Sequence, residues 1–140
     1  MSTPLVVYEL PNNIVNGTLI PLSTLPVPVA ALSLEAGENA PIIIRGTVGW
    51  QVTLTDEIVQ KTVVLFKIWR GAPYSGTLIY SIRDSGESWA DMNKTTSFVH
   101  VDDGIVTAGI YTYTLTVELA SVGKANIVGP LLFSLTDINA

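Results

Sequence analysis

The sequence predicts an all-β protein, an antiparallel sandwich or jelly roll of about eight strands, preceded by an extended proline-rich arm. Hydrophobic and polar residues alternate with a period of two along several segments, which is the pattern of half-buried strands. Runs rich in glycine, proline, aspartate and serine separate these segments at regular intervals. No segment has the hydrophobic spacing that a helix of useful length requires.

The two clearest strands are predicted over 42–54 and 110–119. In the first, hydrophobic residues share one face, and Gly46 and Gly49 predict a bulge or a close approach of another backbone. In the second, every other residue is threonine or glutamate, and β-branched threonine favours a strand. The residues expected in the core are Trp50, Phe66, Tyr111, Leu115 and Phe133.

Less regular patterns predict the remaining strands. The run 62–70 is apolar on both faces, as a central or interface strand would be. Short strands are expected over 77–82 and 95–101, and a last one over 127–137. The expected turns lie at 35–38, 71–73, 84–87, 102–104 and 121–124.

The composition favours a subunit that associates with copies of itself. Hydrophobic residues make up 48% of the 140 residues, whereas charged residues make up only 14%, well below the usual share. A monomer of this composition would expose an unusually apolar surface, so we expect a homo-oligomer, with a threonine-rich monomer as the alternative. The net charge of −5 argues against nucleic-acid binding, which needs basic residues.

The first 33 residues differ from the rest of the chain because they are rich in proline yet apolar, unlike a disordered tail. We therefore divide the chain into an extended N-terminal arm, 1–33, and a sandwich domain, 34–140. The arm is expected to lie over its own domain or a neighbour's, and to act as a connector that adds to a neighbour's exposed sheet edge. The expected assembly contacts are Leu5, Val6, Val7, Tyr8, Leu10, Ile14, Val15, Leu19, Ile20 and, outside the arm, Trp89.

No group of residues predicts catalysis, a metal site or a cofactor. The chain has no cysteine, which excludes disulfides, thiolate catalysis and cysteine-based metal sites. The only histidine, His100, lies in a predicted strand without the partners of a zinc site or a catalytic triad. The carboxylates of Glu87, Asp91, Asp102 and Asp103 lack the spacing of a calcium loop, so solvated turns are expected there.

The tryptophans raise the alternative of a sugar-binding surface. Trp50 and Trp69 lie in strand patterns, where packing in the core is expected. Trp89 lies in a polar stretch and is expected to be exposed or at an interface. Two matches to the N-glycosylation acceptor, at 16–18 and 93–95, are interpreted as chance because the sequence shows no basic segment of a secretory signal peptide. No apolar run approaches the roughly 20 residues of a membrane span.

Several stretches together resemble bacterial spore-surface proteins of the exosporium type. The block AGIY at 108–111, followed by an alternating strand, is similar to the jelly roll of the tumour-necrosis-factor-like superfamily, which bacilli use in exosporium proteins. The resemblance covers most of the chain after residue 41. The stretches that carry it are GTVGWQ at 46–51, FKIWRG at 66–71, VDDGIVTAGIYTYTLTVEL at 101–119 and GPLLF at 129–133.

This resemblance implies a structural subunit of a spore-surface layer or filament that self-assembles into trimers, rings or filaments, with other spore-surface proteins as further partners. It implies a location on the spore surface, reached without a secretory signal peptide by assembly inside the mother cell. The lack of cysteine departs from spore appendage subunits, which are usually cross-linked through cysteines. A carbohydrate-binding β-sandwich and a phage or virus-like structural protein stay open as alternatives.

Overall fold

A computed structural model describes residues 5–10, 20–53, 61–87 and 93–138. These residues form nine β-strands and no helix, and therefore no helix that could cross a membrane. The strands are β1 (Leu5–Leu10), β2 (Ile20–Pro21), β3 (Val27–Ala36), β4 (Ile42–Val52), β5 (Lys61–Arg70), β6 (Thr77–Glu87), β7 (Asn93–Asp102), β8 (Gly109–Leu119) and β9 (Ala125–Asp137).

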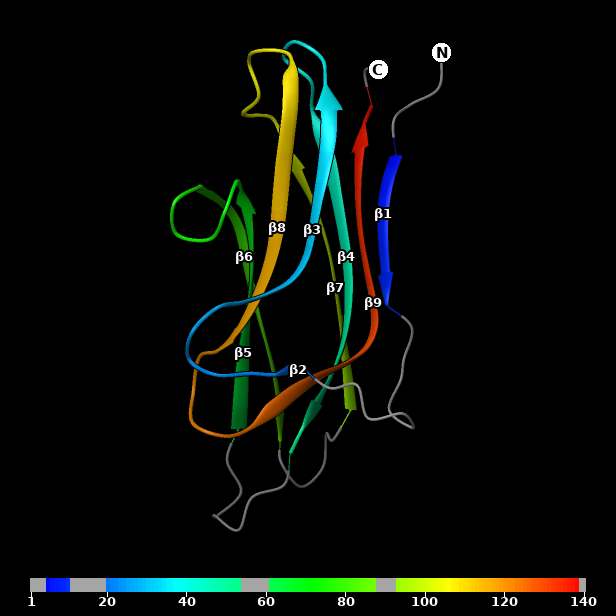
Figure 1. Cartoon of the computed structure of the whole chain (residues 1–140). Helices are drawn as coiled ribbons and strands as arrows, with labels where there is room; N and C mark the ends of the chain where they lie inside the picture. Colours follow the sequence, from blue (N-terminus) through cyan, green and yellow to red (C-terminus); the bar gives the residue numbers. More distant parts are fainter. Residues whose placement is uncertain (1–4, 11–19, 54–60, 88–92, 139–140) are drawn as a thin grey trace.

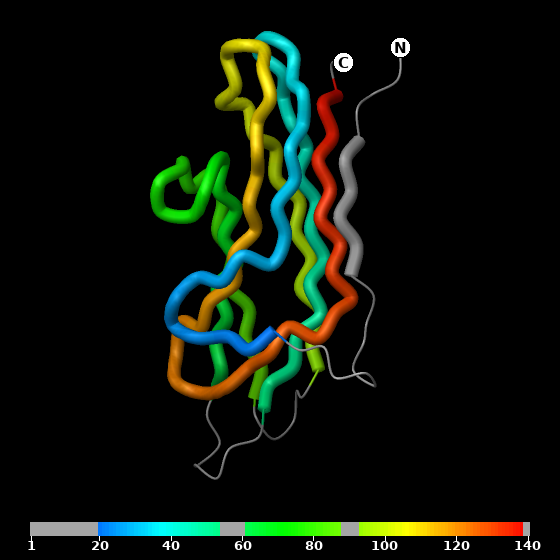
Figure 2. The backbone as a smooth tube through the Cα atoms, in the orientation of Figure 1, coloured from blue at the N-terminus to red at the C-terminus, as the bar shows by residue number. Residues whose placement is uncertain are grey.

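The strands build two antiparallel sheets that face each other (Figure 1). Sheet A has the order β1-β9-β4-β7, and β2 pairs with β9 as well; sheet B has the order β3-β8-β5-β6. The chain crosses repeatedly between the sheets, first where β2 beside β9 leads into β3 beside β8 (Figure 2). This strand order confirms the predicted antiparallel jelly roll.

Alternate residues of both sheets point inward and form one hydrophobic core. Trp50, Phe66, Leu115 and Phe133 are at most 1% exposed, as the alternation predicts. Tyr111 also points inward but is only partly buried, because it lies near the start of β8. The prediction of the core is therefore correct at four positions and overestimates the burial of the side chain at the fifth.

Two glycines of β4 allow neighbouring groups to approach more closely than any side chain would. A Cβ atom at Gly46 would collide with the ring of Phe98, which packs across it from β7. A Cβ atom at Gly49 would collide with the backbone oxygen of Gly129, where β9 bulges and its register with β4 shifts. The predicted bulge and close approach of another backbone are both found at Gly49, whereas Gly46 makes room for a side chain.

The turn predicted at 84–87 is wrong, because these residues lie inside β6. The sequence DSGE is typical of a turn, but here the carboxylate of Asp84 is bound within the fold. Its Oδ1 accepts the backbone N–H of Ser85, and its Oδ2 accepts the hydroxyl of Thr96 on β7. These bonds hold the segment in register with β5, so β6 is almost twice as long as predicted.

The described strands in the N-terminal third of the chain belong to both sheets. β1 pairs with β9 over six residues and β2 pairs with the same strand further along. β3 pairs with β8 from Val27 to Ala36, so the domain boundary predicted between residues 33 and 34 falls inside a strand of sheet B. The prolines do not prevent this pairing because β3 is an edge strand, and Pro28 lies at an irregularity of the ladder.

Candidate assembly surface and buried polar clamp

The outward side of strands β4, β7 and β9 in sheet A carries few charges. On β4, β7 and β9 the residues between the buried ones point away from the core and lie in cross-strand rows. Among the outward side chains of these strands that the structure describes, Arg45 carries the only charge. The A face consists of Ile43, Arg45, Thr47, Thr95, Ser97, Val99, Val101, Leu132, Ser134 and Thr136.

Hydrophobic residues interrupt the polar rows of the A face. Val99 is 59% exposed and Val101 46%, although both lie in a regular strand. Val101 lies opposite Ile43, and Val99 opposite Arg45, in the register of β7 with β4. Thr47 and Ser97 lie one row further along the strands. Their hydroxyl oxygens share a hydrogen bond of 3.2 Å, so these hydroxyl groups depend less on hydrogen bonds to water.

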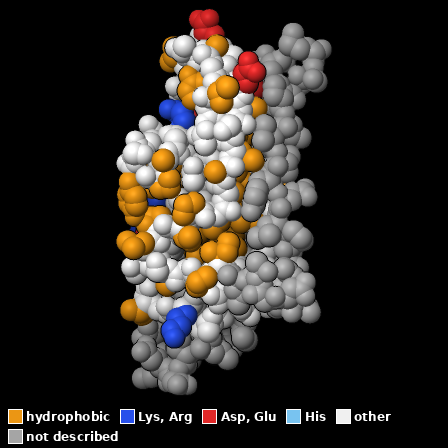
Figure 3. All heavy atoms as spheres, in the orientation of Figure 1, with side chains coloured by type: hydrophobic (Ala, Val, Ile, Leu, Met, Phe, Trp, Pro, Cys, Tyr) orange, Lys and Arg blue, Asp and Glu red, His pale blue; other side chains and the backbone are white. Residues whose placement is uncertain are grey.

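The outward side of sheet B has a different character. It carries charges of both signs, and Lys67 forms an ion pair of 2.8 Å with Glu118 across β5 and β8. Figure 3 shows the side on which β3 and β8 lie, where hydrophobic side chains are spread over much of the surface, basic side chains lie among them and acidic side chains lie at the end with the termini. The charged residues of this B face are Glu35, Lys61, Lys67, Arg83, Glu87 and Glu118.

The B face also holds an exposed aromatic side chain that the sequence did not single out. Tyr74 lies in the loop between β5 and β6 and is 69% exposed. Its backbone has a φ of 66°, a value that residues other than glycine rarely adopt. Its ring packs on Trp69 at 5.8 Å between ring centroids. Trp69 is buried but lies outside the core that was expected for it. It points outward under Tyr74, as the regular alternation of β5 after the inward Ile68 places it.

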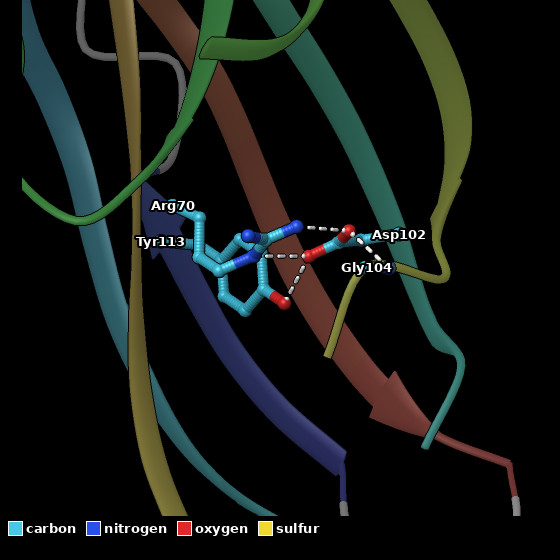
Figure 4. Close-up of polar contacts among 4 residues, drawn as sticks. All are labelled: Arg70, Asp102, Gly104 and Tyr113. Atoms are coloured by element: carbon cyan, nitrogen blue, oxygen red, sulfur yellow. Dashed lines mark hydrogen bonds and ion pairs between the residues drawn. The ribbon is translucent and has the colours of Figure 1, made fainter. Parts of the chain in front are cut away.

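A buried polar clamp joins the two sheets (Figure 4). Arg70, at the end of β5 in sheet B, donates to Asp102 of β7 in sheet A through Nε at 2.8 Å and Nη2 at 2.6 Å. The hydroxyl of Tyr113, on β8, donates to the same carboxylate at 2.6 Å, and the backbone N–H of Gly104 donates at 3.0 Å. Asp102 is 4% exposed and Tyr113 is fully buried.

The charges and hydrogen bonds of the clamp stabilise one another. Burial opposes ionisation of Asp102, but the hydrogen bonds from Arg70, Tyr113 and Gly104 outweigh it and hold the pKa of the carboxyl below its ordinary value. Burial, with the neighbouring carboxylate, raises the pKa of the Tyr113 hydroxyl, and the hydrogen bond to Asp102 raises that of Arg70. At neutral pH the site is thus a paired carboxylate and guanidinium with a neutral phenol.

A second polar chain crosses between the sheets near the other end of β7. The indole N–H of Trp50 donates to the hydroxyl of Thr96 at 2.9 Å, and that hydroxyl donates to Asp84 at 2.6 Å. Lys94 lies 3.3 Å from the other oxygen of Asp84 and donates to the carbonyl of Ser85. Burial raises the pKa of Asp84, but these hydrogen bonds and the charge of Lys94 outweigh it and lower that pKa overall.

Neither polar cluster has the parts of a catalytic or metal site in the residues described. Both oxygens of Asp102 are bound by other side chains and by backbone, so this carboxylate has no vacant position for a ligand. His100 stacks on Tyr80 at 4.7 Å between ring centroids and bridges the edges of the two sheets. The described residues contain no group of three or more histidine, aspartate or glutamate side chains that could hold a metal ion.

The predicted assembly contacts fall in three places. Leu5, Val6, Val7, Tyr8 and Leu10 form β1 on the edge of sheet A. Ile20 lies in β2 and packs against the core of its own domain. The contacts predicted at Ile14, Val15, Leu19 and Trp89 lie outside the described residues, as does the carboxylate of Asp91.

The A face was missed by sequence reasoning. The segment 95–101 alternates only weakly, because Phe98 on one side is flanked by Val99 and Val101 on the other. A strand with apolar residues on both sides can be a central strand, but β7 is an edge strand. The sequence therefore did contain an indication of this face: the outward side of β7 is more apolar than is usual for an edge strand.

Comparison by sequence finds no match to any protein-family model or curated protein. Comparison of structures finds jelly rolls. The T13 particle of infectious bursal disease virus matches 96% of this chain with a TM-score of 0.60 and 7% identity, and the VP2 subviral particle of that virus matches 96% with 0.57 and 8%. The chain spans about a third of the length of these viral proteins, 31% and 33%.

A third similar structure is Eiger TNF from S. frugiperda, with a TM-score of 0.49, 11% identity and coverage of 96% of this chain and 93% of that one. At such identities the similarity to the viral proteins establishes the fold alone. It confirms the jelly roll that the sequence resemblance implied. A spore-surface origin stays a prediction.

Proposed function

We propose that this chain is a structural subunit that assembles with copies of itself through the A face, with no enzyme activity. The observation that carries the proposal is the difference in charge between the described outward residues of the A face and those of the B face. A regular sheet surface with exposed Val99 and Val101, and with Arg45 as the only charge described on it, is costly to leave in water.

The partner that fits this face best is a second copy. Burying a charged side chain between two copies costs free energy of desolvation unless the charge finds a partner. The A face has fewer described charges than the B face, so this cost is smaller there. A flat sheet also packs well on another sheet, because the rows of side chains on the two surfaces interdigitate at about 10 Å between the sheets.

The biological setting is a finer part of the proposal. We infer that the assembly belongs to a spore-surface layer or filament, with other proteins of that surface as further partners. The sequence resemblance supports this setting, and the jelly roll of viral particle proteins supports a role in an assembled shell more generally. Antibody labelling of intact spores from the source organism tests the location, and unlabelled spores would contradict it.

The assembly is tested by paired charge substitutions. Val99→Glu places a negative charge on the A face, and Ile110→Glu places one on the B face, where Ile110 is 77% exposed. We expect the wild-type chain and Ile110→Glu to form the same oligomer in sedimentation velocity, and Val99→Glu to shift towards the monomer. A wild-type monomer at all concentrations, or equal behaviour of the two variants, would contradict the proposal.

A further inference from the structure

β1 and β2 cover one edge of the same strand, but the chain between them is longer than that edge requires. Leu10 lies opposite Leu131, and Ile20 lies opposite Ile127. The first two residues are ten positions apart in the sequence, whereas their partners on β9 are four positions apart. A continuous strand would need equal numbers on both sides.

The surplus gives β1 a long reach. Ten steps of extended chain span at most about 35 Å, against roughly 13 Å for four steps of a strand. β1 can therefore lie on β9 of its own chain or on the same strand of a neighbouring subunit, while β2 stays in place. Among the described strands, β1 contacts β9 along its whole length and β3 to a smaller extent, so its pairing with β9 is its main tie to them.

The edge that β1 covers is suited to receive it from either chain. Without β1, the backbone groups of β9 from Leu131 to Thr136 would be an open sheet edge, which attracts another strand. A second copy brings the identical segment with the identical register, so the exchange gains and loses the same contacts. The exchange is therefore decided by whether a neighbour's edge is within reach.

We infer that in the assembled protein β1 pairs with β9 of a neighbouring copy instead of its own. This inference rests on the proposed self-assembly, because the A face includes the outward residues of β9 and a partner on that face brings its own β9 close. The partner is a second copy of this chain, and the surface it offers is the edge of β9 beyond Leu131. Each subunit then gives one strand and receives one.

The absence of cysteine from the chain makes a clean test. Val7 and Ser134 lie opposite each other in the β1–β9 pairing, at the Cα separation that a disulfide accepts. The double variant Val7→Cys/Ser134→Cys is oxidised in the assembled state and run on a non-reducing gel. We expect covalently linked chains. The matched control, Ile43→Cys/Thr136→Cys, joins β4 and β9 on the same face and is expected to close within one chain.

Each alternative result overturns the inference in a recognisable way. If Val7 and Ser134 link within one chain while the protein stays oligomeric, β1 is not exchanged, although self-assembly through the A face stands. If the control also links chains, contact between faces explains both cross-links, and the exchange is wrong. If the thiols of the test pair stay free while the control pair closes, β1 does not occupy β9 in either chain. A wild-type monomer removes both the exchange and the proposed function.

Discussion

The two outer faces of the sandwich are built on the same plan but differ in what they can do. Both have threonine and serine between hydrophobic residues, and both cover the same core. The B face adds charges of both signs, which bind water strongly and cost free energy to bury against a second copy. The A face, with Arg45 alone among its described charges, has much less charge to desolvate.

This difference shows which part of the sequence determines the fold and which part determines the assembly. The inward residues of the two sheets form one shared core, so they specify one sandwich without distinguishing its outer faces. The outward residues contribute little to the fold, because solvent-exposed substitutions change stability by only about half a kcal/mol. They are free to differ, and the scarcity of charge on the outward side of β4, β7 and β9 marks that side as the one to be covered.

The largest expected effect comes from substitutions in the core, which test whether both sheets contribute equally to its stability. Leu115 of sheet B and Leu135 of sheet A are both fully buried. Replacing either by alanine removes buried methylene groups and leaves a cavity, which lowers the free energy of unfolding by roughly 2–5 kcal/mol. Urea denaturation of the two variants measures it. A cost below about half a kcal/mol for either one would place that residue outside the core.

The polar clamp is expected to have a smaller effect at neutral pH. Asp102→Asn removes the charge that faces Arg70, and because Arg70 is partly exposed we expect a loss of roughly 1–3 kcal/mol in the free energy of unfolding. The matched control is Asp103→Asn, next to it and exposed, for which a change within about 0.5 kcal/mol is expected. Equal effects of the two substitutions would show that the clamp does not join the sheets.

The clamp also predicts how stability depends on pH. The pKa of Asp102 is lower in the folded chain than in the unfolded one, so its contribution is complete above the ordinary aspartate pKa of about 3.9 and is lost as the pH falls further. Denaturation between pH 7 and pH 2 should therefore show a steeper acid decline for wild type than for Asp102→Asn. Parallel curves would contradict the paired carboxylate.

Much of the fold could be predicted from the sequence because alternation is a local property. The strands β4 and β8 and four of five core residues follow from it directly. The turn predicted at 84–87 was wrong because the partner of Asp84, Thr96 on β7, is distant in sequence. The order of the strands and the pairing of Arg70 with Asp102 have the same cause, since both depend on contacts between remote segments.

The assembly surface was harder to predict than the core. Low charge indicated a self-associating chain, but it did not indicate which residues share a face. The assembly contacts were predicted in the apolar N-terminal segment instead, because its combination of proline and hydrophobic residues is unusual. In the structure that segment supplies β1, β2 and the start of β3, and the exposed valines of β7 form part of a different surface.

The most direct test of the A face is its accessibility in the assembled protein. Single cysteines introduced by Val99→Cys and Ile110→Cys place one thiol on each face of a chain that otherwise has none. Their rates of reaction with a thiol reagent are compared between dilute and concentrated protein. The account predicts that concentration slows the reaction of the A-face thiol and leaves that of the B-face thiol unchanged. Equal rates for the A-face thiol at both concentrations, or slowing of the B-face thiol alone, would contradict it.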